Sequence, residues 1–117
     1  MQRVVCIKSM TIIFSSYLQR PVELTDERKQ HIVLQHPDLV PDYIDLIVQV
    51  IEDPDEVRSD TRFPNTQLFS RWFADLKQGK FVVVVIVSDS IPVERLWIVT
   101  AYIARRLTQG VIQWKRN

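Results

Sequence analysis

The sequence has little of the residue types on which several kinds of site depend: among 117 residues it holds one cysteine and two glycines. Because Cys6 has no second cysteine to pair with, an internal disulfide and a cysteine-based zinc site are excluded. Two isolated glycines cannot make a glycine-rich phosphate-binding loop. The longest apolar run, residues 81–87, is too short for a membrane helix, which needs about 20 residues.

The length and composition predict one ordinary globular domain. A hydrophobic fraction of 46% and a charged fraction of 25% are typical of such a domain. We expect a single domain over residues 1–117, with an N-terminal strand or arm over 1–20 and a core over 22–114. The start of the chain lacks the features of a signal peptide, so we expect a cytoplasmic protein without a membrane partner. The sequence does not predict an oligomeric state.

Charge is unevenly distributed although the net charge is only +1. Residues 38–60 hold eight acidic residues and one basic residue, Arg58. From Arg95 onward there is no acidic residue, and five basic residues alternate with aromatic ones. This mixture suits contacts with phosphates and bases and favours Arg105, Arg106 and Trp114 as substrate-binding residues. A solvated strand edge with a basic end is the competing interpretation.

Two helices are predicted in the first half of the chain. Thr25 suits an N-cap, acidic residues follow it, and Pro37 ends the helical pattern, which predicts a helix over residues 26–35. Pro41 suits the first position of a second helix, whose apolar positions follow the spacing i, i+3, i+4, i+7. These buried positions are Ile44, Ile47, Val48 and Ile51.

The rest of the chain predicts strands, over residues 57–59, 67–74, 81–87 and 93–103. Short turns between them favour antiparallel pairing. The expected fold class is therefore α+β: two N-terminal helices packed on an antiparallel sheet of about four strands. Regular alternation in the last strand would put one apolar set toward the helices: Trp97, Val99, Ala101 and Ile103. The opposite set is Leu96, Ile98, Thr100 and Tyr102.

Five side chains form the candidate catalytic set: His31, His36, Arg71, Thr100 and Tyr102. Imidazoles transfer protons near neutral pH, and a hydroxyl, a phenol and a guanidinium can hold a phosphate. Arg71 joins the set if its strand face is that of Tyr102. The two histidines are five positions apart, about 140° around a helix, and cannot both face one direction. No spacing of metal ligands occurs, so neither a metal nor a cofactor is expected.

Several strings in this order resemble the phage-associated nuclease family of the barnase, EndoU, colicin and RelE-like fold, abbreviated BECR. They are His31-Ile-Val-Leu-Gln-His36-Pro37, Asp53-Pro54-Asp55-Glu56-Val57, Ile98-Val99-Thr100-Ala101-Tyr102 and Gly110-Val-Ile-Gln-Trp114. The resemblance implies a helical pair on a small antiparallel sheet and RNA cleavage without a metal. It also implies that His31 and His36 occupy positions that the family pattern uses.

These observations predict a metal-independent endoribonuclease, a toxin or phage-derived effector. The ribose 2′-hydroxyl would attack the adjacent phosphorus and leave a 2′,3′-cyclic phosphate and a 5′-hydroxyl. RNA is then the substrate, and a protein antitoxin or inhibitor is a possible partner. The alternative is a noncatalytic module that binds RNA or a protein with the same fold.

Overall fold

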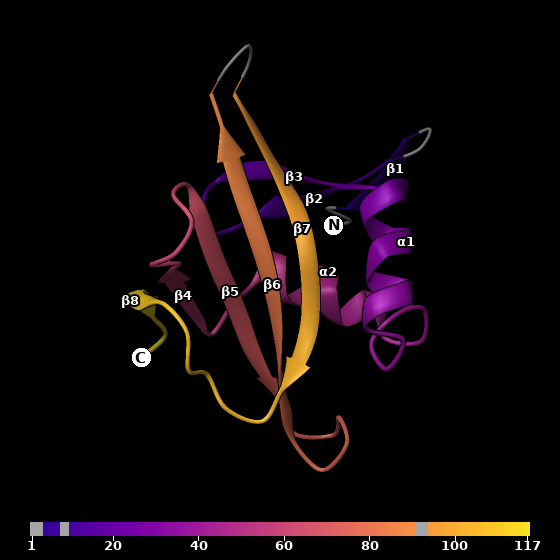
Figure 1. Ribbon diagram of the computed structural model, residues 1–117, viewed down its shortest axis with the longest axis vertical. Helices are drawn as coiled ribbons and strands as arrows, with labels where there is room; N and C mark the ends of the chain where they lie inside the picture. Colours follow the sequence, from indigo (N-terminus) through magenta and orange to yellow (C-terminus); the bar gives the residue numbers. More distant parts are fainter. Residues whose placement is uncertain (1–3, 8–9, 91–93) are drawn as a thin grey trace.

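The computed structural model describes residues 4–7, 10–90 and 94–117. Within these ranges the chain forms eight strands and two helices (Figure 1). In chain order they are β1 (Val4–Ile7), β2 (Met10–Ser15), β3 (Arg20–Thr25), α1 (Asp26–Gln35), α2 (Ile44–Glu52), β4 (Glu56–Ser59), β5 (Thr66–Phe73), β6 (Lys80–Asp89), β7 (Arg95–Ala104) and β8 (Val111–Lys115).

Helix α1 begins and ends where its local signals predict. The Thr25 side-chain oxygen accepts a hydrogen bond from the backbone N–H of Arg28 at 3.2 Å, which satisfies one of the free donors of the first turn. Acidic residues follow in that turn, and their negative charge interacts favourably with the positive end of the helix dipole. His36 is the C-cap, directly before Pro37. The predicted span is confirmed.

Helix α2 starts later than the sequence suggests. Residues 37–43 form turns and the helix begins at Ile44, so Pro41 precedes the helix instead of opening it. The Val40–Pro41 peptide bond is cis. The predicted apolar stripe does reach the core: Ile47 and Ile51 are fully buried, and Ile44 and Val48 are half-buried against it. The helix ends before Asp53-Pro54, where proline disfavours a continued helix.

The expectation of two helices on an antiparallel sheet of about four strands was wrong. The sheet has the strand order β1-β2-β3-β7-β6-β5-β4-β8. The four predicted strands lie side by side at its centre, but β3 adds a parallel neighbour to β7 and β8 adds an antiparallel neighbour to β4. Neither β3 nor β8 was predicted as a strand. Both pair with strands distant in sequence, a choice that local patterning does not reveal.

A β-bulge in β7 reverses the predicted faces of that strand. Val85 pairs with Thr100 and Ile86 pairs with Ile98, so Val99 is an extra residue without an opposite partner. Before the bulge Leu96 and Ile98 are buried in the core, whereas Trp97 and Val99 are partly exposed. After the bulge Ala101 is buried as predicted. The expectation that Trp97 and Val99 face the core was therefore wrong.

The core lies between the helices and one face of the sheet. Alternate residues of β6, among them Val82 and Val84, join Phe69 of β5 and the buried side of α2. The sheet curls around this core, since the Tyr17 ring beyond β2 lies 5.5 Å from the Trp114 ring of β8 at the other end of the strand order. The opposite face of β5, β6 and β7 does not belong to this core. Among the described helices, none has the length and apolar character to cross a membrane.

Candidate functional site

A cavity of about 610 Å³ lies on the sheet face away from the helices. The segment 105–110, which leads from β7 to β8 across this face, forms one wall (Figure 1). We call this segment the strap. The volume falls within the range of about 300–1,000 Å³ that is common for small-molecule sites.

The cavity is lined by both apolar and polar side chains, and some of the polar ones, among them Thr66 and Ser70, are buried. Strand β6 supplies Val83, Val85 and Val87, and β5 supplies Leu68. The polar lining comes from β4 and the loop after it, from β5, from β7 and from the strap: Arg58, Asp60, Arg62, Thr66, Ser70, Thr100, Tyr102, Arg106, Thr108 and Gln109. An apolar floor with a few convergent polar groups is typical of a ligand site.

Thr100 and Tyr102 both line this cavity, so the prediction that they project to the same side of their strand is confirmed. Burial raises the pKa of the Tyr102 phenol above its ordinary value of 10.0; the charge of Arg62 opposes this increase, and the carboxylate of Asp60 adds to it by a smaller amount. The phenol is therefore a neutral hydrogen-bond donor at physiological pH. It is suited to donate to an anion and not to act as a base.

The hydroxyl of Thr100 is a second donor in the cavity wall. Its Oγ1 atom is buried and has no hydrogen-bond partner among the residues that the structure describes. An unsatisfied buried hydroxyl costs about 1–3 kcal/mol. This orphan donor favours a ligand that supplies a polar atom.

Asp60, Arg62 and Gln109 form a polar network at the rim. The Asp60 carboxylate accepts a hydrogen bond from the backbone N–H of Arg62 at 2.7 Å, and this bond, with the side chain of Arg62, lowers the pKa of Asp60. Arg62 Nη2 also donates to Gln109 Oε1 at 2.6 Å. The network fixes the Arg62 guanidinium beside the cavity and ties it to the strap.

Gly110 lets the strap approach the sheet closely. Its φ is +81°, and a Cβ atom at this position would lie 2.7 Å from the backbone oxygen of Ser59. Arg58 holds the same part of the strap, because its Nη1 donates to the backbone oxygen of Gln109 at 3.2 Å. Glycine is required here for both conformation and space.

The two histidines differ in their relation to the cavity. The imidazole of His36, at the end of α1, lies 5.9 Å from the Tyr102 ring between centroids. The prediction that His31, His36 or Arg71 lies within about 10 Å of Tyr102, a span that one phosphate could bridge, is confirmed by this pair. Neither histidine is itself among the cavity-lining residues, and His31 lies in the middle of α1. The ring contact joins His36 to Tyr102, whose side chain lines the cavity.

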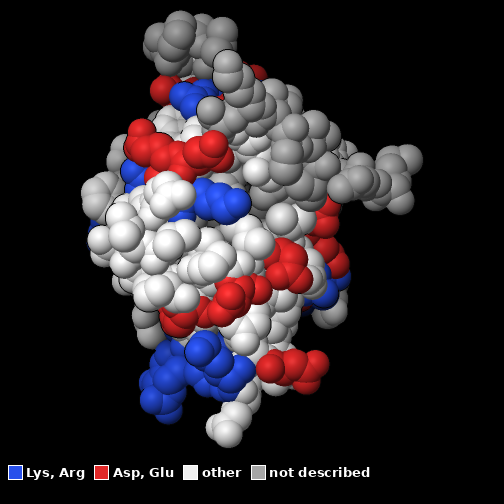
Figure 2. Space-filling model, turned by 90° about the vertical axis from the view of Figure 1, so that its right-hand side faces the viewer, with Lys and Arg blue, Asp and Glu red and all other residues white. Residues whose placement is uncertain are grey.

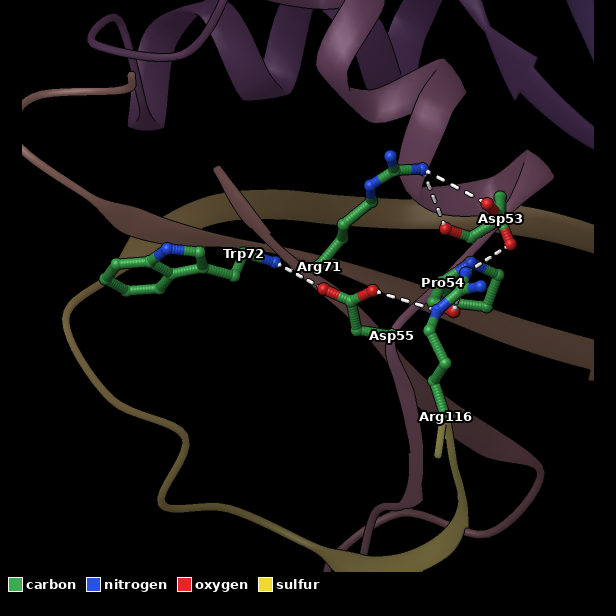
Figure 3. Close-up of polar contacts among 6 residues, drawn as sticks. All are labelled: Asp53, Pro54, Asp55, Arg71, Trp72 and Arg116. Atoms are coloured by element: carbon green, nitrogen blue, oxygen red, sulfur yellow. Dashed lines mark hydrogen bonds and ion pairs between the residues drawn. The ribbon is translucent and has the colours of Figure 1, made fainter. Parts of the chain in front are cut away.

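Arg71 lies on the face of the sheet away from the cavity. Its Nη1 donates to the backbone oxygen of Asp53 at 3.1 Å and lies 3.5 Å from the Asp53 carboxylate (Figure 3). The alternation along β5 puts Leu68 and Ser70 in the cavity wall, whereas Phe69 between them and Arg71 after them point the other way. The hypothesis that Arg71 shares a surface with Tyr102 was therefore wrong.

Figure 3 shows that Arg71 belongs to a separate ionic network, which we call the Asp53 clamp: Asp53, Pro54, Asp55, Arg71, Trp72 and Arg116. The guanidinium of Arg116 forms ion pairs with Asp53 and Asp55, and these carboxylates raise the pKa of Arg116. Asp55 also accepts from the backbone N–H of Trp72 at 2.9 Å. The clamp connects Arg116, which follows β8 in sequence, to the residues directly before β4.

Of the predicted substrate-binding residues, Arg106 lines the cavity, while Arg105 and Trp114 do not. Arg106 is exposed and forms no ion pair with any described residue. In Figure 2 a group of cations gathers at the end of the molecule where Figure 1 places the end of β7 and the β5–β6 turn. In the sequence, Lys77, Lys80, Arg105 and Arg106 belong to these segments. This end of the molecule can attract a polyanion.

Asp60, Arg62 and Gln109 were not predicted from the sequence as site residues. One local signal was available, because an aspartate that accepts from the backbone N–H two residues later forms an Asx turn, and Asp60-Thr-Arg62 has this geometry. The role of Gln109 depends on the path of the strap, which no local pattern specifies.

In comparisons with known proteins, no protein-family model, no curated protein and no solved structure matches this chain. Within the described ranges, no group of three or more histidine, cysteine, aspartate or glutamate side chains is placed to hold a metal ion.

Proposed function

We propose that the protein is an endoribonuclease that cleaves RNA at the cavity without a metal ion. The observation that supports this proposal most is the juxtaposition of three kinds of group: the His36 imidazole beside Tyr102, the Tyr102 phenol in the cavity wall, and the guanidiniums of Arg62 and Arg106 at the rim. Proton transfer, hydrogen-bond donation and phosphate binding are the functions that this reaction requires.

The reaction is an internal transesterification. The ribose 2′-oxygen loses its proton and attacks the adjacent phosphorus, and the bond from phosphorus to the 5′-oxygen breaks as that oxygen takes up a proton. His36 takes up the proton of the 2′-hydroxyl and returns it to the leaving 5′-oxygen, Tyr102 donates a hydrogen bond to a phosphate oxygen, and the two arginines stabilise the negative charge of the phosphorane. The products are a 2′,3′-cyclic phosphate and a 5′-hydroxyl.

The resemblance to phage-associated BECR nucleases supports the same proposal, although the sheet is larger than that resemblance implies. Under this proposal the protein acts in the cytoplasm as a toxin or phage-derived effector. A protein antitoxin or inhibitor is then the expected partner, and blocking the cationic end near β7 would be a direct way to inhibit cleavage.

The test is incubation of the purified protein with end-labelled single-stranded RNA in EDTA. The expected result is cleavage that persists in EDTA, yields 5′-hydroxyl ends, and stops when the ribose at the cleaved position lacks its 2′-hydroxyl. Tyr102→Phe should reduce the rate about 10²- to 10³-fold, as does removal of one donor from a charge-stabilising site. Tyr43→Phe is the matched control, since Tyr43 is exposed at the start of α2.

Intact RNA under all conditions, with or without added divalent metal, would contradict the proposal. If the protein then still bound RNA in a salt-dependent way, the noncatalytic RNA-binding module would replace the enzyme as the proposed function.

A further inference from the structure

The cavity has an apolar part that phosphate binding does not require. Guanidiniums are sufficient to hold a phosphate, yet here they accompany a sheet surface on which three valines of β6 and Leu68 of β5 lie beside the hydroxyls of Thr66, Ser70 and Thr100. A charged phosphate would gain nothing from such a floor, because burial of an ion among apolar groups costs free energy. A ligand that fills this cavity therefore has a flat or apolar part for the floor and an anionic part for the rim.

We propose that the cavity binds one unstacked nucleotide of single-stranded RNA, with its base on the floor of Val83, Val85 and Val87 and its phosphate at Arg62 and Arg106. This inference rests on the proposed function, because it takes RNA as the ligand. A nucleobase has an apolar face and a polar edge, which matches the two surfaces of the cavity.

Two further observations support a base in this position. The buried Thr100 hydroxyl, which has no partner among the described residues, can bond with the polar edge of a base. The exposed ring of Phe63, which lines the cavity and lies 5.5 Å from the guanidinium carbon of Arg62, offers an aromatic surface for stacking.

The shape of the site selects against a duplex. Double-stranded RNA is recognised across a broad surface of successive grooves, and its bases are stacked and paired. A cavity covered on one side by the strap admits a base only after the base has left its stack. Single-stranded segments supply such bases at the lowest cost.

Binding of uridine and guanosine 3′-monophosphates, measured by calorimetry and by NMR shifts, tests the proposal. We expect saturable binding that a single-stranded oligoribonucleotide displaces and that neither ribose 5-phosphate nor duplex RNA displaces at equal concentration. Val85→Phe fills the floor and should weaken nucleotide binding at least tenfold. Val111→Phe is the matched control, because it makes the same change at an exposed position of β8 and should leave binding unchanged.

Displacement by ribose 5-phosphate or by duplex RNA as effective as by single-stranded RNA would overturn the proposal. So would unchanged nucleotide binding by folded Val85→Phe or Val87→Phe, with folding checked by circular dichroism. The competition with wild-type protein decides the matter even if both variants fail to fold. RNA cleavage that Val85→Phe leaves intact refutes the base site alone, whereas nucleotide binding without cleavage refutes the enzyme alone.

Discussion

The protein has two arginine-rich regions that differ in how their charge is satisfied. In the Asp53 clamp, Arg71 and Arg116 are paired with carboxylates and backbone oxygens. At the cavity, Arg106 forms no ion pair with a described residue, and Arg62, although paired with Asp60, keeps more than half of its side chain exposed at 59%.

The difference shows why a count of basic residues does not locate a binding site. A cation whose charge is already neutralised by two carboxylates has little attraction left for a phosphate. The basic residues of the clamp hold the chain end in place, whereas Arg106, which lines the cavity without an ion pair to a described residue, is available to a ligand. The Thr100 hydroxyl, which has no partner among the described residues, also belongs to the cavity and not to the clamp.

The largest expected effect separates the two histidines. His36→Asn should reduce RNA cleavage about 10²- to 10⁴-fold, the range for loss of a proton-transferring group. His31→Asn makes the same change in the middle of α1, whereas His36 lies at its end against the Tyr102 ring, and we expect less than a threefold reduction for His31→Asn. Single-turnover rates measure both, and thermal melts check folding. Equal losses in the two folded variants would show that proximity to Tyr102 is not what matters.

The second prediction compares the two arginine regions directly. Arg106→Gln should weaken RNA binding about tenfold and reduce the slope of the logarithm of affinity against the logarithm of salt concentration by about one, since one phosphate contact is lost. Arg71→Gln should leave both unchanged and lower the free energy of unfolding by about 0.2–1 kcal/mol, as expected for a partly exposed ion pair. Fluorescence titrations at several salt concentrations and urea denaturation measure the two properties. A reversed pattern would place the RNA at the clamp.

The sequence predicted those parts of the fold that local signals determine. The N-cap at Thr25 and the stop at Pro37 set α1, and the apolar stripe from Ile44 to Ile51 identified the buried side of α2. Short turns between consecutive apolar segments predicted the four central strands and their antiparallel pairing. The pairing of β3 with β7 and of β8 with β4 joins distant segments, so local patterning could not predict the full sheet.

The site was predicted in part for the same reason. Thr100 and Tyr102 share a face because they lie two positions apart after the bulge, where alternation holds. Alternation failed before Val99, because whether a strand bulges depends on its partner. Arg71 was assigned to the site because its face could not be chosen from the sequence, and Asp60 and Gln109 were missed because tertiary structure brings them together.

The third prediction concerns the strap that closes the cavity. Gly110→Ala should lower the free energy of unfolding by about 1–3 kcal/mol, the cost of a left-handed conformation in a residue with a Cβ atom. The added atom would also meet the backbone oxygen of Ser59 at 2.7 Å, so the strap must shift and nucleotide binding should weaken. Val111→Ala, at an exposed neighbouring position that does not line the cavity, is the control. Unchanged stability and binding in Gly110→Ala would show that the strap tolerates another path.

The smallest expected effect is also the most diagnostic, because it moves stability and binding in opposite directions. Thr100→Val replaces an unpartnered hydroxyl with a methyl group of nearly the same shape. The free energy of unfolding should rise by up to about 1 kcal/mol, since an unsatisfied buried polar group is removed. Nucleotide binding should weaken several-fold, since the ligand loses a hydrogen-bond partner.

Thr66→Val is the matched control in the same cavity, because the Thr66 hydroxyl already donates to the backbone oxygen of Pro64 at 3.1 Å. Its loss should lower the free energy of unfolding and leave nucleotide binding unchanged. Chemical denaturation and nucleotide titration on both variants measure the two responses. A Thr100→Val variant that loses stability and binds nucleotide normally would show that this hydroxyl serves the fold and not a ligand.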